Sequence, residues 1–211
     1  MTDKSFRYGT LWLLGIIVLA YLAQIFVPGF KDLFVLDATK VIDEPWRLVT
    51  SIFLHGSIAH LFLNCFALFL FGLILEKEIG TKNFLLLFFC SGMLAGIGAV
   101  LFYPSSLGAS GAIYGIMGML AVLKPGMTVW VSYVPMPMIV AIFVWAAIDF
   151  FGIFMPSNVA NAAHLAGLFF GVIAGILHRI FYSKPKTSKT GHLDPYDEGA
   201  LDDYERKSGL R

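Results

Sequence analysis

Residues 83–123 read NFLLLFFCSGMLAGIGAVLFYPSSLGASGAIYGIMGMLAVL, and these 41 positions contain no Asp, Glu, Lys or Arg. One helix of about 20 apolar residues crosses a bilayer core about 30 Å thick, so this run is long enough for two crossings. Residues 103–108, YPSSLG, interrupt the run with residue types that are typical of a turn. The stretch therefore predicts two consecutive membrane helices, over 84–102 and 110–123.

The second of these helices is unusually short for a membrane crossing. At about 1.5 Å per residue, residues 110–123 rise about 21 Å, which is less than the hydrocarbon thickness of about 30 Å. We therefore expect its N-terminus, at Ser110, to lie roughly 10 Å below the membrane surface. Backbone N–H groups cannot stay unpaired in lipid, so this helix end must face protein or a water-filled cavity.

Further apolar runs flank this stretch and also predict helices. No Asp, Glu, Lys or Arg occurs over 8–30 or 48–75, and Asp149 is the single such residue over 125–178. With a turn of Pro, Ser and Asn at 156–158, these runs predict four more helices, over 9–28, 57–75, 129–153 and 159–181. The chain is thus predicted to be an all-α membrane protein, a six-helix bundle whose short fourth helix starts inside the membrane.

Composition supports the same class of protein. Hydrophobic residues make up 58% of the 211 positions and charged residues 14%, against about 45–50% and about 25% in soluble domains. So much apolar surface excludes a disordered chain, and a net charge of +1 argues against a nucleic-acid partner. Cys65 and Cys90 lie within apolar runs and predict neither a disulfide framework nor a metal site.

Two polar segments lie outside the predicted helices. Residues 31–47 carry seven charges and end in Pro-Trp-Arg, which is typical of a connection at the membrane surface. Residues 183–211 are predicted to form a disordered, cytoplasmic tail after a six-helix domain over 1–182. A signal peptide over 8–30 is disfavoured because no small-residue cleavage site follows that run.

The distribution of basic residues predicts the orientation. If the N-terminus is cytoplasmic, twelve Lys and Arg residues lie inside and three lie outside, namely Lys31, Lys40 and Arg47. Cytoplasmic segments carry the excess of Lys and Arg, so both termini are expected in the cytoplasm. A plasma membrane, and a prokaryotic one, is the expected location for so small a chain.

Four polar side chains converge in this topology. His60 and Asn64 open the second helix, Ser110 opens the fourth and His164 lies in the first turns of the sixth. All three helices run from outside to inside, so these costly groups share one layer in the outer leaflet. Convergence of polar groups from three separate segments is typical of a functional site.

These residue types are suited to acyl transfer. A serine hydroxyl becomes a nucleophile when a neutral imidazole accepts its proton, so Ser110 and His164 are a candidate pair. The tetrahedral intermediate carries an oxyanion that fixed N–H donors stabilise. The Ser110 backbone N–H is one such donor, and His60 and Asn64, spaced i, i+4 on one helix face, are two more.

Small residues predict that two of the helices approach closely. Gly111, Gly115 and Gly118 share a face of the fourth helix, and Gly167 and Gly171 follow His164 at the GxxxG spacing. Such faces let helix backbones meet, which would bring Ser110 and His164 together. The aromatic residue one turn beyond Ser110, Tyr114, is placed to pack against an imidazole.

Each residue taken alone has a simpler interpretation. Membrane serines usually bond to their own helix, and single His or Asn residues usually hold helices together. For Asp149, near the end of the fifth helix, a capping or interface role is favoured over pairing with His164. For His55, bracing the site, binding substrate and lying in a solvated loop all stay open. A transporter is disfavoured because no internal repeat is apparent.

Three motifs resemble the rhomboid family of intramembrane serine proteases. The sequence GASG at 108–111, with Tyr114 after it, is similar to the serine motif of that family. The sequence HGSIAHLFLN at 55–64 resembles its H-x4-H-x3-N motif, and AHLAGLFFG at 163–171 resembles its AH-x2-G-x3-G motif. Matches also occur at Pro-Trp-Arg, 45–47, and at GLILEKEIG, 72–80, so the resemblance covers about 45–171.

The resemblance implies a serine endopeptidase that cleaves transmembrane protein substrates within the lipid bilayer, without metal or cofactor. It implies that Ser110 is the nucleophile and His164 the base, in a dyad without a third acid. It assigns His60 and Asn64 to the oxyanion hole and implies that Glu76 ties the turn after the second helix to its surroundings. The supporting residues that it implies are His55, Gly108, Gly111, Tyr114, Gly167 and Gly171. A proteolytically inactive relative that only binds membrane proteins is the alternative.

Overall fold

The computed structural model describes residues 7–155 and 159–182. Contacts divide the chain into a unit of Met1–Phe181 and a unit of Tyr182–Arg211, and only Tyr182 of the second is described. The predicted tail over 183–211 and the predicted break at 156–158 therefore lie outside the described residues.

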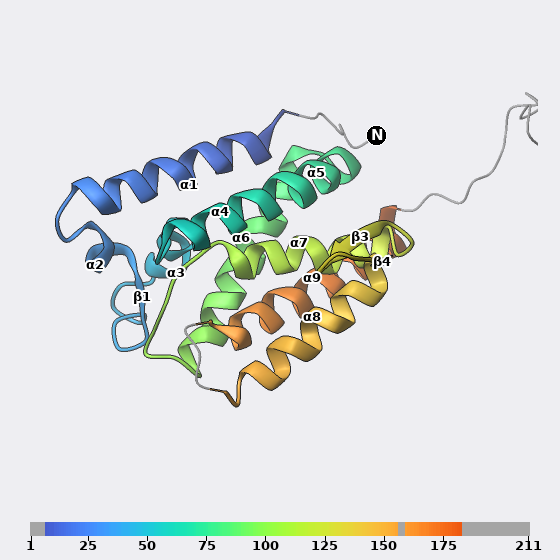
Figure 1. Ribbon diagram of the computed structural model, residues 1–211. Coiled ribbons are helices and arrows are strands. Elements are labelled where there is room, and N and C mark those ends of the chain that lie inside the picture. The colour runs from blue at the N-terminus through green and yellow to red at the C-terminus, as the bar shows by residue number, and fades with distance from the viewer. Residues whose placement is uncertain (1–6, 156–158, 183–211) are drawn as a thin grey trace, which may run out of the picture. The chain divides into compact units, whose positions relative to one another are not determined.

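Among the residues that the structure describes, four helices are long and apolar enough to cross a membrane (Figure 1). They are α1 (Gly9–Phe26), α6 (Thr81–Val100), α9 (Asn161–Tyr182) and a continuous helix over Ile58–Ile79. That last helix consists of α4 (Ile58–Ala67), a π-helical turn (Leu68–Gly72) and α5 (Leu73–Ile79). The all-α membrane class is confirmed, and the chain is an integral, multi-pass membrane protein.

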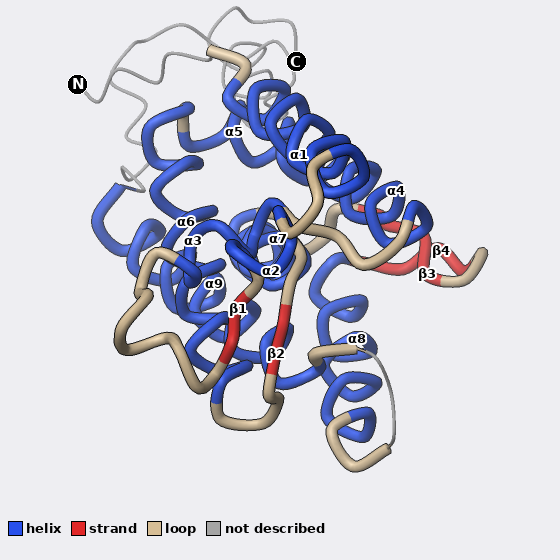
Figure 2. Tube along the Cα trace, turned by 90° about the vertical axis from the view of Figure 1, so that its left-hand side faces the viewer, coloured by secondary structure: helices blue, strands red, loops and turns tan. Residues whose placement is uncertain are grey.

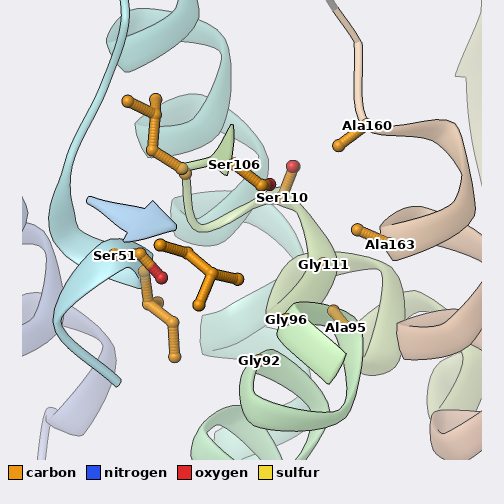
Figure 3. A pocket seen from close by; sticks show the side chains of 13 residues that line it. Ser51, Gly92, Ala95, Gly96, Ser106, Ser110, Gly111, Ala160 and Ala163 are labelled. Atoms are coloured by element: carbon orange, nitrogen blue, oxygen red, sulfur yellow. The ribbon is translucent and has the colours of Figure 1, made fainter. Parts of the chain in front are cut away.

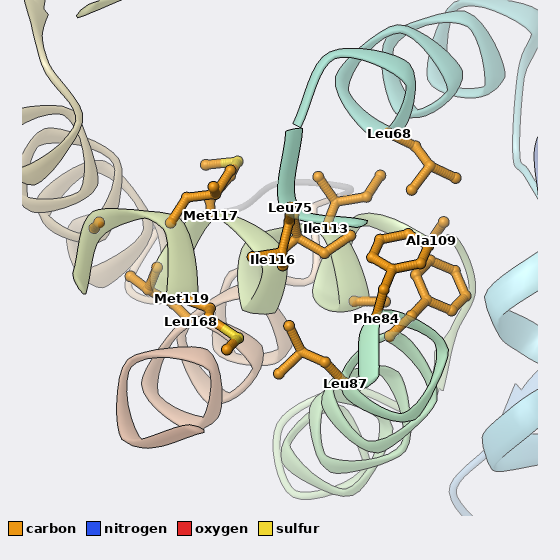
Figure 4. Packing of buried hydrophobic residues seen from close by; sticks show 14 of the residues in the cluster. Leu68, Leu75, Phe84, Leu87, Ala109, Ile113, Ile116, Met117, Met119 and Leu168 are labelled. Atoms are coloured by element: carbon orange, nitrogen blue, oxygen red, sulfur yellow. The ribbon is translucent and has the colours of Figure 1, made fainter. Parts of the chain in front are cut away.

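Two shorter apolar helices, α7 (Ser110–Leu123) and α8 (Met138–Gly152), lie between α6 and α9 in the chain, which is compatible with the six predicted helices. The predicted bounds of α7 match the structure. Ten of its fourteen residues are buried, and in Figures 1 and 2 it lies among the other helices. Figure 4 shows its apolar side chains, among them Ile113 and Ile116, packed against Leu75, Phe84 and Leu87.

The predicted start of the fifth helix at residue 129 is wrong. A hairpin of β3 (Thr128–Val131) and β4 (Val134–Pro137) precedes α8, with Val129 opposite Met136. Pro135 and Pro137 have no N–H group and break a helix interior, so the helix starts directly after the second proline. The absence of charge from this stretch concealed the change from helix to strand.

The surface connection between α1 and α4 is ordered around Arg47. It contains α2 (Phe30–Phe34), β1 (Leu36–Asp37) and α3 (Arg47–Thr50), and Figure 2 shows β1 beside β2 (Ser105–Ser106). The buried guanidinium of Arg47 donates to the carbonyls of Asp32, at 2.9 Å, and Val35, at 2.7 Å, and pairs with Glu44. This loop therefore holds β2, which leads into α7, in a fixed place.

Glu76, near the end of α5, is fully buried and joins three helices. Its carboxylate accepts the backbone N–H groups of Gly9 and Thr10, at 2.6 and 2.9 Å. It also accepts the hydroxyls of Thr10, at 2.7 Å, and of Thr81, at 2.5 Å. The first N–H groups of a helix have no partner within it, so this carboxylate caps α1 and fixes it to the α5–α6 turn.

Candidate active site

Ser110 and His164 form a hydrogen-bonded pair. Ser110 is the first residue of α7, and His164 lies in the first turn of α9. The imidazole Nε2 is 2.8 Å from the serine Oγ. This is the nucleophile and base geometry that the chemistry of the two side chains requires.

Glycines allow this approach, as the sequence predicts. A Cβ atom added at Gly167 would overlap the carbonyl oxygen of Gly111, and one at Gly171 would overlap the carbonyl oxygen of Gly115. The backbones of α7 and α9 are therefore in direct contact along two turns, the close packing that small residues permit in membrane helices. Residues 54 positions apart, Ser110 and His164, meet at the end of this contact.

The His164 ring is held by two further side chains. The Tyr114 ring stacks on it, with centroids 4.3 Å apart and an interplanar angle of 13°. On the far side from Ser110, the Asp149 Oδ1 lies 3.0 Å from His164 Nδ1. The predicted stacking of Tyr114 is thus seen, whereas the preferred capping role for Asp149 is wrong, because its buried side chain faces α9 instead of the helix end.

His60 lies against the loop that leads to Ser110. Gly108 has φ +120°, and a Cβ added there would lie 2.8 Å from Cε1 and 2.9 Å from Nε2 of the His60 ring. Only glycine fits this position, both for its backbone conformation and for the close ring. The backbone N–H of Gly108 donates to the Ser51 carbonyl at 2.9 Å, so the loop is fixed from both sides.

Asn64, one turn after His60, is buried, and its side chain bonds to its own helix. Its Nδ2 donates to the His60 carbonyl at 2.9 Å, which uses one of the two N–H donors of the amide. The Asn64 Oδ1 is buried and has no hydrogen-bond partner among the described residues. The second N–H donor is the group that a substrate oxygen would need.

His55 packs behind His60 instead of contacting Ser110. It is 1% exposed, its ring centroid is 4.9 Å from that of His60, and its ring nitrogens have no partner among the described residues. Burial, and then the neighbouring His60, lowers the pKa of His55 from 6.5 to about 4. Of the alternatives that the sequence leaves open, the structure favours bracing and contradicts a solvated loop.

Gln24 is a supporting residue that the sequence analysis missed. Its side-chain oxygen accepts the His55 backbone N–H at 2.9 Å, and its Nε2 donates to the His55 carbonyl at 3.1 Å. A polar residue near the end of the apolar helix α1 was the available signal, since polar groups in membrane spans are costly. Gln24 thus links α1 to the segment that carries His55 and His60.

A small pocket opens beside Ser110 (Figure 3). Ser51 and Ser106 line it together with small residues of α6, among them Gly92, Ala95 and Gly96. In Figure 3 the Ser110 side chain lies close to Ser106, and Ala160 and Ala163 face it from the side of α9. The polar hydroxyls and the small side chains leave room next to Ser110.

This combination defines a class: a multi-pass, all-α membrane protein with a serine–histidine pair at a helix end, enclosed by other helices. A model of the family described as "Rhomboid domain" matches residues 43–181, well over half of the chain. The chain belongs to the rhomboid family. The matched region contains every predicted site residue, from His55 to Gly171.

Several relatives share this region. The putative rhomboid protease YdcA of Bacillus subtilis is 34% identical over 137 residues, 64% of this chain and 67% of YdcA. Rhomboid protease GluP of the same species is 38% identical over 133 residues, 62% of this chain and 25% of GluP. RHOMBOID-like protein 6, mitochondrial, of Arabidopsis thaliana is 35% identical over 146 residues, 67% of this chain and 47% of that protein. The matched region thus spans less than half of the plant relative and less than half of GluP.

Proposed function

We propose that this protein is a serine-type endopeptidase that cleaves transmembrane protein substrates near the outer leaflet. The observation that carries the proposal is the contact of 2.8 Å between Ser110 Oγ and His164 Nε2 at the N-terminal end of α7. The names of two relatives, putative rhomboid protease YdcA and rhomboid protease GluP, support it. In this proposal both termini are cytoplasmic, and lipids and transmembrane proteins are the partners.

In the first half of the proposed reaction, His164 acts as general base. Its Nε2 accepts the Ser110 hydroxyl proton while Oγ attacks the scissile carbonyl carbon, which gives a tetrahedral intermediate with a negatively charged oxygen. The Ser110 N–H has no partner within α7 and, with the free Asn64 N–H and the His60 ring, supplies donors for that oxygen. The imidazolium then gives its proton to the leaving amine, and an acyl-enzyme remains.

In the second half, water replaces the amine. His164 removes a proton from a water molecule, the hydroxide attacks the ester carbonyl carbon, and the proton returns to Ser110 Oγ as the acid product leaves. The reaction needs water at a site within the bilayer. The pocket of Ser51, Ser106 and Ser110, with hydroxyl groups on its wall, is suited to hold it.

Cleavage of a fluorescent single-span substrate by the purified, lipid-reconstituted protein tests this proposal. We expect Ser110→Ala and His164→Ala each to lower the rate by at least about 10⁴-fold, as in soluble serine proteases. Thermal unfolding in detergent serves as the control, because Ser110→Ala deletes one hydroxyl and leaves the fold intact. A well-folded parent that cleaves none of several substrates would favour the inactive, membrane-protein-binding alternative.

A further inference from the structure

Asp149 holds a position that the proposed dyad does not use. It contacts His164 at Nδ1, whereas Ser110 contacts the same ring at Nε2. The three side chains therefore form a continuous chain of hydrogen bonds. Tyr114 stacks on the face of the ring and leaves both nitrogens to these partners. Helices α7, α8 and α9 each contribute one residue to this chain of hydrogen bonds.

The burial of this carboxylate calls for a partner. Asp149 is 3% exposed and is the single Asp, Glu, Lys or Arg residue of the apolar helix α8. An acidic group in a membrane helix is costly unless another group compensates it. Its Oδ1 contacts His164, its Oδ2 is buried without a hydrogen-bond partner among the described residues, and the Tyr114 side chain also interacts with the carboxylate.

We infer that Asp149 is a positioning residue for His164. Its carboxylate accepts the Nδ1–H of the neutral imidazole, which fixes the tautomer whose Nε2 lone pair points at the Ser110 proton. When Nε2 takes that proton, the neighbouring carboxylate stabilises the imidazolium. This inference rests on the proposed function for its catalytic consequence, and on the contact of 3.0 Å alone for the tautomer.

Other titratable groups around the ring do not explain the same geometry. Tyr114 lies on the face of the ring, and His60, on α4, interacts with His164 electrostatically. Neither group bonds to Nδ1 among the described residues, whereas Asp149 does. Asp149 is therefore the group whose removal changes which ring nitrogen carries the proton.

The kinetic test compares Asp149→Asn with Asp43→Asn, which removes an exposed carboxylate from the loop before Arg47. In soluble serine proteases, replacing the Asp that bonds to the catalytic histidine by Asn lowers kcat by about 10⁴-fold. We expect Asp149→Asn to lower kcat at least tenfold with KM within twofold. Asp149→Glu, which keeps a carboxylate, should recover part of the loss, and Asp43→Asn should match the parent.

A second readout does not depend on proteolysis. Nitrogen NMR of the lipid-reconstituted protein, labelled with ¹⁵N-histidine, reports which nitrogen of each neutral ring is protonated. The His164 signals are assigned by their loss in His164→Gln. We expect the proton on Nδ1 in the parent and in Asp43→Asn, and a mixture of the two tautomers in Asp149→Ala.

The outcomes separate this inference from the proposed function. A changed tautomer in Asp149→Ala, together with a parent that cleaves no substrate, would support the positioning role and count against the proteolytic activity. An active parent whose kcat is unchanged in Asp149→Asn would overturn the inference. A His164 ring protonated at Nε2 in the parent would overturn it as well. Thermal unfolding midpoints identify any variant whose loss comes from misfolding.

Discussion

The helix over Ile58–Ile79 carries buried polar groups at both ends, and the two ends differ in how these groups are satisfied. Glu76, at the α5 end, accepts four hydrogen bonds from α1 and from Thr81. At the α4 end, the Asn64 oxygen and both ring nitrogens of the neighbouring His55 are buried without a partner among the described residues. Twelve residues, about 18 Å along a helix, separate Asn64 from Glu76.

This difference distinguishes a structural polar network from a functional one. Unpaired buried polar atoms are rare, and each one requires an explanation. A network in which every group is paired stabilises one packing, as at Glu76. Around Asn64 and His55 the missing partners are those that water or a substrate carbonyl would provide under the proposed function.

The largest effect is expected at the close contact between α7 and α9. Gly167→Leu places a large side chain against the Gly111 carbonyl oxygen, where not even a Cβ atom fits. Backbone atoms cannot move aside as a flexible side chain can, so α7 and α9 must separate. We expect loss of the folded state, seen as the absence of a cooperative thermal transition in detergent. Gly15→Leu is the matched control, because no atom lies within 4 Å of its Cβ position.

Glu76→Ala should have the next largest effect on stability. It leaves the backbone N–H groups of Gly9 and Thr10 and two threonine hydroxyls without their acceptor. Losing one partner of a buried, charged network costs about 3–5 kcal/mol in free energy of unfolding. Unfolding by SDS in mixed micelles measures this value. The control is Glu78→Gln, which removes a half-exposed ion pair with Lys124 and should cost less than about 1 kcal/mol.

Acid should weaken the α4 end through His55. The pKa of its ring is about 4 in the folded protein, against 6.5 when unfolded, so the unfolded chain binds more protons between these values. Stability is complete above about pH 7 and falls as the pH drops from 6.5 to 4, by up to about 3 kcal/mol. SDS unfolding measured over this pH range should show the decline. His55→Gln, which does not titrate, should have a flatter profile, and equal slopes would contradict the assignment.

Asn64→Ala should have the smallest effect on stability and a large effect on activity. Among the described residues, the side chain makes one hydrogen bond, to the carbonyl of His60 on its own helix, and its oxygen is already unpaired. We expect the free energy of unfolding to fall by less than about 1 kcal/mol. The cleavage rate should fall by about 10²–10³-fold, the usual loss for one oxyanion donor. A stability loss in Asn64→Ala as large as that in Glu76→Ala would contradict the proposed difference between the two ends of the helix.

Much of the helical arrangement could be predicted because a membrane restricts the choices. Runs without charge must be helices in lipid, so the bounds of α7 and the approximate extent of α1, α6 and α9 follow from the sequence. The same reasoning failed at the hairpin of β3 and β4. Absence of charge indicates an apolar setting, but over residues 128–137 it does not distinguish a strand from a helix. Pro135 and Pro137 were the better signal, because proline breaks a helix interior.

The site could be predicted in its members but not in its connections. Ser110 and His164 were identifiable because glycine faces bring their helices together, which spacing along each helix reveals. The contact of Asp149 with His164 depends on the rotation of α8 about its own axis, and no pattern within α8 specifies that rotation. Gln24 was missed for a related reason, since its partners are backbone atoms of His55, and backbone groups leave no trace in a sequence.

The carboxylate of Glu76 also bears on where the functional unit begins. The family match starts at residue 43, after α1, so a boundary drawn from similarity alone would leave α1 outside the domain. Yet three of the four hydrogen bonds to Glu76 come from Gly9 and Thr10, at the start of α1. A chain trimmed to the matched region would leave the buried Glu76 carboxylate without these three hydrogen bonds. The smallest segment that can fold on its own therefore extends at least to residue 9.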